Sequence, residues 1–172
     1  MRLFVAVRPP DEVLDLVAAV PRPEVTPARW TTRAQWHITL RFLGNVSDPT
    51  PVIAALGRVA AMLAPADVTV GPKPGVLGHQ VVYLPVTGLD EVADRVVRAT
   101  AEFGEPPTRR RFRGHLTLAR TKGGTMSLSS LSSLSGLAVA ASWTVGEIEL
   151  IRSHLGGGPA RYEVLSSFAL SG

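Results

Sequence analysis

Apolar and polar positions repeat with two different periods along the chain. Alternation with a period of two predicts strands at residues 2–8, 36–43, 67–70, 80–86, 114–120, 143–154 and 161–169, with a shorter one starting at 29–30. Spacings of three and four residues predict helices at about 10–20, 48–63 and 89–103. Strands outnumber helices, so we expect an α+β fold with antiparallel sheets.

Proline and glycine mark the boundaries of these elements. Pro9-Pro10 opens the first predicted helix and Pro49 the second, as is usual for a helical first turn. The run Gly156-Gly157-Gly158-Pro159 separates the last two strands and predicts a hairpin. Residues 127–136, rich in serine and leucine, fit either a short helix or a loop. The third helix carries its apolar face on Val92, Val96, Val97 and Ala101.

Length and composition narrow the class of protein. A chain of 172 residues that is 45% hydrophobic is long enough to bury one core, so we expect a single domain over residues 1–172. With no cysteine, disulfides, a thiolate nucleophile and cysteine-ligated metal sites are excluded. The apolar run at 3–7 is too short for a signal peptide, and no stretch reaches membrane-spanning length. We therefore expect a cytoplasmic monomer with no membrane partner.

The positive charge of the chain is almost entirely arginine. The formal net charge is +4, and lysine occurs only at Lys73 and Lys122. The planar guanidinium offers a fork of donors that suits phosphate, so an anionic partner is one interpretation. An arginine-rich surface without any ligand is an equally good one.

A tetrad of residues occurs twice, and it is the most informative feature of the sequence. His37-Ile38-Thr39-Leu40 and His115-Leu116-Thr117-Leu118 both lie in segments with strand periodicity. Because side chains alternate between the faces of a strand, each histidine shares a face with its threonine, about 7 Å apart. The leucines and the intervening apolar residue anchor the opposite face.

Two histidines that face one substrate suit displacement at phosphorus. One imidazole can accept a proton from the attacking water while the other protonates the departing oxygen, so no metal or other cofactor is required. The threonine hydroxyls can donate hydrogen bonds to the non-bridging oxygens. Three alternatives stay open: polar residues on a solvated sheet face, a non-catalytic RNA-binding module, and a zinc hydrolase. The zinc interpretation lacks any His-x-x-x-His or His-x-His spacing.

Two arginines near the motifs are candidate phosphate ligands. Arg41 lies two residues after Thr39, so alternation puts it on the face of His37. Arg120 lies three residues after Thr117 and is expected on the opposite face, unless the strand ends there. We expect the aromatic residues Trp30, Trp36 and Phe42 to lie in the core, and His79 and His154 to lie on the surface. The basic residues at 109–113 fit either a solvated turn or an RNA contact.

The paired motifs resemble those of the 2H phosphoesterase superfamily, and within it the bacterial RNA 2′,3′-cyclic phosphodiesterases, historically called 2′-5′ RNA ligases. The resemblance extends over essentially the whole chain. It includes the blocks at 1–7, 37–44 and 112–120, and the ending from Glu149 through Leu165. One departure is Gly114, which stands where this family usually has proline before the second histidine.

The resemblance implies a fold and a reaction. The fold is two pseudo-symmetric lobes, each an antiparallel sheet with packed helices, with the active-site groove between them. His37 is then the proton donor, His115 the proton acceptor, and Thr39, Thr117, Arg41 and Arg120 the phosphate-binding residues. The implied substrate is RNA or a nucleotide with a 2′,3′-cyclic phosphate, and the product is a 2′-phosphomonoester. Ligation or cleavage of 2′-5′ linked oligonucleotides and hydrolysis of ADP-ribose cyclic phosphate are the other activities that the resemblance allows.

Overall fold

The computed structural model describes residues 1–25, 27–121, 123–127, 132–134, 136–156 and 159–172. In chain order the elements of these residues are β1 (Arg2–Val7), α1 (Asp11–Ala18), β2 (Arg29–Trp30), the 3₁₀ helix η1 (Arg33–Gln35), β3 (Ile38–Asn45), α2 (Thr50–Ala60), β4 (Ala66–Val70), β5 (Gly75–Leu77), β6 (Val81–Thr87), α3 (Asp90–Ala99), β7 (His115–Arg120), β8 (Ala141–Val145), β9 (Glu147–His154) and β10 (Arg161–Ala169).

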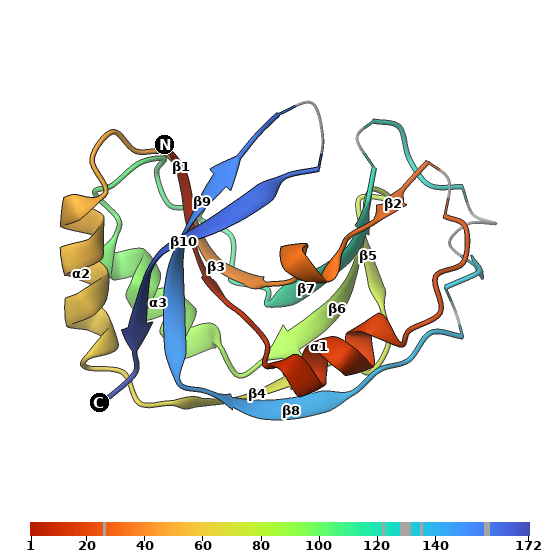
Figure 1. Ribbon diagram of the computed structural model, residues 1–172, viewed down its shortest axis with the longest axis horizontal. Coiled ribbons are helices and arrows are strands. Elements are labelled where there is room, and N and C mark those ends of the chain that lie inside the picture. The colour runs from red at the N-terminus through yellow and green to blue at the C-terminus, as the bar shows by residue number, and fades with distance from the viewer. Residues whose placement is uncertain (26, 122, 128–131, 135, 157–158) are drawn as a thin grey trace.

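The strands form one antiparallel sheet that curls strongly (Figure 1). Its order is β10-β9-β1-β3-β7-β6-β4-β8, with β2 added to β7 and β5 added to β6. The first half of the sheet consists of β10, β9, β1 and β3, and the second half consists of the remaining strands. Helices α2 and α3 pack on the first half, α2 on β9 and β10 and α3 on β3, whereas α1 packs on β8 in the second half. The predicted antiparallel α+β fold is confirmed. The two halves share one sheet, however, and in the described ranges the first half carries two α-helices and the second half one.

The two halves meet at the strands that carry the repeated tetrad. Strands β3 and β7 are neighbours, and a single residue pair, Ile38 with Leu116, joins them. Both side chains are fully buried, in one hydrophobic cluster that extends through both halves. The fold therefore brings together two motifs that lie nearly eighty residues apart in the sequence.

The predicted strand at 143–154 is in fact two strands. Gly146 separates β8 from β9, and the two pieces have different partners: β8 pairs with β4, whereas β9 pairs with β1 and β10. The alternation changes phase at the break, because Trp143 and Val145 are the apolar positions before Gly146 and Ile148 and Leu150 are those after it. The prediction of one continuous strand overlooked this signal. Strand β5 was also missed, because three residues are too few to show a period.

Helix α3 ends earlier than its apolar spacing predicts. Val92 and Val96 are buried as expected, but Ala101 lies beyond the helix and is exposed. The hydroxyl of the buried Thr100 donates to the carbonyl of Val96 and closes the last turn. Gly104 then turns the chain at a φ of +64°, a conformation that favours glycine.

Two sequence expectations fall partly outside the described residues. Residues 128–131 and 135, within the serine-rich segment, are among those not described, and so are 157 and 158 in the terminal turn. The strands on either side of that turn, β9 and β10, pair as the predicted hairpin. Of the helices in the described ranges, none has the length and apolar character needed to cross a membrane.

Candidate active site

Each of the two motif histidines is held by the same backbone contact. Nδ1 of His37 lies 2.8 Å from the carbonyl oxygen of Gln35, and Nδ1 of His115 lies 2.8 Å from that of Arg113. A carbonyl oxygen only accepts hydrogen bonds, so Nδ1 carries the hydrogen in both rings. In the neutral imidazoles Nε2 is consequently left as a proton acceptor.

The sheet register places the four motif side chains on one face, which we call the histidine face. Ala6 pairs with Thr39, and Tyr83 pairs with Thr117. Continuing the antiparallel register from the Ile38 and Leu116 pair puts each histidine opposite the threonine of the other strand. The faces predicted for the two tetrads are therefore confirmed.

The two imidazoles have different surroundings on this face. The His37 ring lies between two aromatic rings, with centroids 4.8 Å from Phe4 and 5.0 Å from Tyr162, the latter edge-on. Phe4 and Tyr162 also contact each other edge-on at 5.3 Å. Among the described residues, His115 has one aromatic neighbour, Tyr83, at 5.7 Å. The matched backbone anchors thus hold one enclosed histidine and one more open histidine.

This enclosure changes the acid–base behaviour of His37. Burial lowers the pKa of His37 from 6.5 to about 4, because the charged imidazolium loses water. The hydrogen bond to Gln35 opposes this shift, while positive charges on Arg120, Arg8 and His115 add to it. His37 is therefore neutral at pH 7 in the ligand-free chain.

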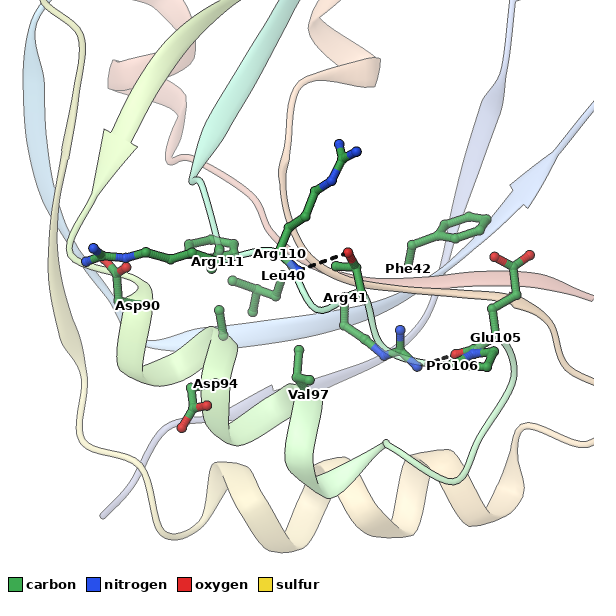
Figure 2. Close-up of a pocket in the computed structure, with 13 residues that line it drawn as sticks. Leu40, Arg41, Phe42, Asp90, Asp94, Val97, Glu105, Pro106, Arg110 and Arg111 are labelled. Carbon is green, nitrogen blue, oxygen red and sulfur yellow. Dashed lines mark hydrogen bonds between the residues drawn. The ribbon is translucent and has the colours of Figure 1, made fainter. Parts of the chain in front are cut away.

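Residue Arg41 does not lie on the histidine face, so this prediction is wrong. A bulge in β3 places Leu40 opposite the step between Val5 and Ala6, and Arg41 then pairs with Val5. Val5 is fully buried on the core face. Arg41 lies on the same face as Val5, and only 6% of the Arg41 surface is exposed. The Arg41 guanidinium donates from Nη2 to the backbone carbonyl of Glu105. Figure 2 shows Arg41 and Phe42 leaving β3 on opposite sides.

A matching bulge in β7 has the opposite effect on Arg120. Leu118 lies opposite the step between Val82 and Tyr83, so Arg120 pairs with Val81 and returns to the face of Thr117. Arg120 is exposed, and its charge acts on both His37 and Tyr162. The alternation rule had assigned it to the other face, and that assignment is wrong for the same reason as for Arg41.

Three polar side chains near the histidine face were missed by the sequence reasoning. Tyr162 comes from β10, with no signal linking it to His37. Glu149 is 8% exposed and pairs across the sheet with Ala6, and its Oε2 lies 3.6 Å from Nε of Arg8. Burial raises the pKa of Glu149, and Arg8 opposes that shift. The alternation of β1 puts Arg8 on the same face as Ala6. That this is the histidine face depends on the register between β1 and β3, which the sequence does not contain.

Gly114 is needed for the approach of β7 to β6. A Cβ on this residue would overlap the backbone oxygen of Val86, and the Val86 amide donates to the carbonyl of Gly114 at 2.9 Å. Glycine at position 114 therefore lets the chain approach β6 closely just before β7 begins at His115.

The other sequence candidates lie away from this face. His154 contacts Glu163 through Nε2 at 2.7 Å on the surface, and His79 is exposed at a φ of +55°. Trp36 is buried, and Trp30 is partly buried against the core. Within the described ranges, no group of three or more histidine, aspartate or glutamate side chains is placed to hold a metal ion.

The low pKa of His37 leads to a direct prediction. In an NMR titration of the imidazole carbons, His37 should titrate near pH 4, because burial disfavours its charged form. Arg120→Met should raise this pKa, whereas Arg95→Met on α3 should not. Since the unfolded chain takes up the proton first, the free energy of unfolding should fall as the pH drops from about 6.5 toward 4. A midpoint for His37 at or above 6.5 would contradict the described enclosure.

Comparison with known proteins places this arrangement in context. The model of the 2′-5′ RNA ligase superfamily matches residues 9–157. The chain is 29% identical over 152 residues to an RNA 2′,3′-cyclic phosphodiesterase from Geobacillus stearothermophilus, covering 83% of this chain and 48% of that protein. It is 33% identical over 106 residues to one from Aeropyrum pernix, covering 56% and 59%. The chain thus spans about half the length of the curated relatives it matches.

Solved structures share the whole fold. TT0787 of Thermus thermophilus superposes with a TM-score of 0.80 at 26% identity, covering 100% of this chain and 99% of that one. LigT of E. coli in complex with 3′-AMP superposes with a TM-score of 0.71 at 28% identity, covering 99% and 98%.

Proposed function

Since the chain belongs to the 2′-5′ RNA ligase superfamily, we propose that it hydrolyses 2′,3′-cyclic phosphodiesters at the ends of RNA or on nucleotides to 2′-phosphomonoesters. The observation that carries this proposal is the matched pair of histidines, each fixed through Nδ1 to a backbone carbonyl and each next to the Ile38–Leu116 pair that joins β3 and β7. Two curated relatives of this chain are RNA 2′,3′-cyclic phosphodiesterases, and E. coli LigT binds 3′-AMP. A monomeric, single-domain, cytoplasmic enzyme stays a prediction.

The proposed reaction needs two proton transfers at one phosphorus atom. Water attacks phosphorus while Nε2 of His115 accepts its proton, and the bond to the ribose 3′ oxygen breaks. Nε2 of His37 donates a proton to that oxygen, which leaves the phosphate on the 2′ oxygen. The hydroxyls of Thr39 and Thr117 donate to the non-bridging oxygens, where charge accumulates. Proton exchange with solvent then restores both histidines.

The donor role requires His37 to be protonated in the complex. Its pKa of about 4 in the ligand-free chain means that little of the free enzyme carries this proton at pH 7. A bound cyclic phosphate brings a negative charge to the histidine face, which raises the pKa of His37 and offsets the charges of Arg120 and Arg8. The open surroundings of His115 suit a group that takes a proton from water.

Arg120 is the arginine that we assign to the phosphate, in place of Arg41. Arg120→Met should raise KM for a nucleoside 2′,3′-cyclic phosphate by about tenfold or more, because a charge-assisted hydrogen bond is lost. The matched change Arg95→Met, on the exposed side of α3, should leave KM unchanged. Steady-state kinetics of both variants make the comparison, and an unchanged KM in Arg120→Met would remove this residue from the site.

The proposal is tested by incubating the protein with the four nucleoside 2′,3′-cyclic phosphates and with an RNA oligonucleotide that ends in one. Chromatography should resolve a 2′-phosphate product and no 3′-phosphate. A chelator in excess should leave turnover unchanged if the two histidines suffice. No turnover of any of these substrates would overturn the proposal.

A ligase is the second candidate, because the same machinery can use a ribose 5′-hydroxyl in place of water. The family name favours testing it. An RNA with a 5′-hydroxyl end, added to the cyclic-phosphate oligonucleotide, should give a 2′-5′ linked product if the ligation occurs. Hydrolysis alone would assign the chain to the first function.

A further inference from the structure

A cavity of about 450 Å³ lies on the opposite side of β3 from the histidine face, between that strand, α3 and residues 105–112 (Figure 2). We call it the Arg41 pocket. Its inner wall is apolar and is formed by Leu40, Val97 and Phe112. A cavity of this size is in the range of small-molecule sites.

The one charge deep in the Arg41 pocket has no acidic hydrogen-bond partner. Among the described residues, Arg41 has a single hydrogen-bond partner, the backbone carbonyl of Glu105, and its buried Nε has none. The Glu105 carboxylate favours the charged guanidinium from a distance, but burial disfavours it. Guanidinium stays protonated even so, and a buried cation without a paired anion is costly. A bound anion at this position would offset that cost.

The rim of the pocket carries one more negative than positive charge. Arg110 and Arg111 lie there with Asp90, Asp94 and Glu105, and all five side chains are exposed. Water screens these rim charges more than it screens Arg41. A polyanion such as RNA therefore finds no positive field at the entrance, whereas a ligand with one negative charge matches the single buried cation.

We propose that the Arg41 pocket binds a small organic monocarboxylate, with its carboxylate on the Arg41 guanidinium and its apolar body against Leu40, Val97 and Phe112. The carboxylate accepts from Nη1 of the guanidinium, which has no hydrogen-bond partner among the described residues, whereas Nη2 is held by the Glu105 carbonyl and Nε is covered by the protein. This binding does not depend on the reaction proposed for the histidine face, because the two sites lie on opposite sides of β3.

Benzoate is a suitable probe, because it combines one carboxylate with an apolar ring. In an NMR titration of arginine side chains, benzoate should shift the Arg41 Nε–Hε resonance saturably, and sodium chloride at equal ionic strength should not. Benzoate should also raise the melting temperature saturably. In Arg41→Met this affinity should fall by about tenfold or more, and in the rim control Arg110→Met it should stay within about twofold.

Several results would overturn this proposal. An Arg41 resonance that does not move, or that moves equally with chloride, rules out a benzoate site there, and this measurement needs no variant to fold. An equal thermal shift in Arg41→Met places benzoate elsewhere. A response to inorganic phosphate or to an RNA oligonucleotide, without one to benzoate, shows that the ligand class is wrong.

Discussion

Alanine at position 115 is expected to reduce kcat for cyclic phosphate hydrolysis by about 10²–10⁴-fold, because water then loses its proton acceptor. The same loss is expected for His37→Ala. The matched control is His154→Ala, which removes a surface histidine on β9 and should leave kcat unchanged. Circular dichroism checks that each variant is folded. Full activity in either motif variant would contradict two-histidine catalysis.

A change of leaving group separates the two roles. Bis(p-nitrophenyl) phosphate releases a phenolate that needs no proton, so a proton donor contributes little to its hydrolysis. His37→Ala should therefore hydrolyse this substrate nearly as fast as the unchanged protein, whereas His115→Ala should be as impaired as before. The opposite result would exchange donor and acceptor, and it would fit the low pKa of His37 in the free chain.

Removing the hydroxyl at position 39 or 117 is the second change with a large expected effect. Thr39→Val and Thr117→Val keep the branched shape that a strand favours, and each should reduce kcat by about 10²–10³-fold, because a donor to the developing charge is lost. KM should change less than kcat, since these hydrogen bonds strengthen in the transition state.

Thr69→Val is the matched control for the threonine variants. Thr69 lies exposed on β4, where its hydroxyl contacts Ser142 at 3.0 Å, so its loss should leave kcat unchanged. If Thr39→Val and Thr117→Val raised KM alone, the hydroxyls would be assigned to ground-state binding. If neither parameter changed, the threonines would have only a structural role.

Local patterns in the sequence were enough to predict most of the sheet and the centre of the candidate site. Alternation located β1, β3, β4, β6, β7 and β10, and helical spacing located all three α-helices of the described residues. His37 and His115 were predicted as site residues because each is followed two residues later by a threonine, and this signal lies within a few neighbouring residues. The pairing of β3 with β7 then confirmed the shared face.

What could not be predicted depends on contacts between distant residues. The bulges at Leu40 and Leu118 follow from pairing with β1 and β6, and each moves the side chains after it to the other face, in β3 as far as a second bulge at Leu43. This is why Arg41 and Arg120 exchanged their expected positions. Tyr162 reaches His37 only through the order of β10, β9, β1 and β3, which no local period contains.

The single pair of residues between β3 and β7 has a mechanical consequence. Ile38 and Leu116 join two half-sheets that are each held by longer ladders, and each half-sheet carries one imidazole. The separation between the two proton-transfer groups is therefore set by one residue pair of the sheet together with the hydrophobic core that both halves share. A substitution at Ile38 or Leu116 would change the spacing of the imidazoles without touching either ring.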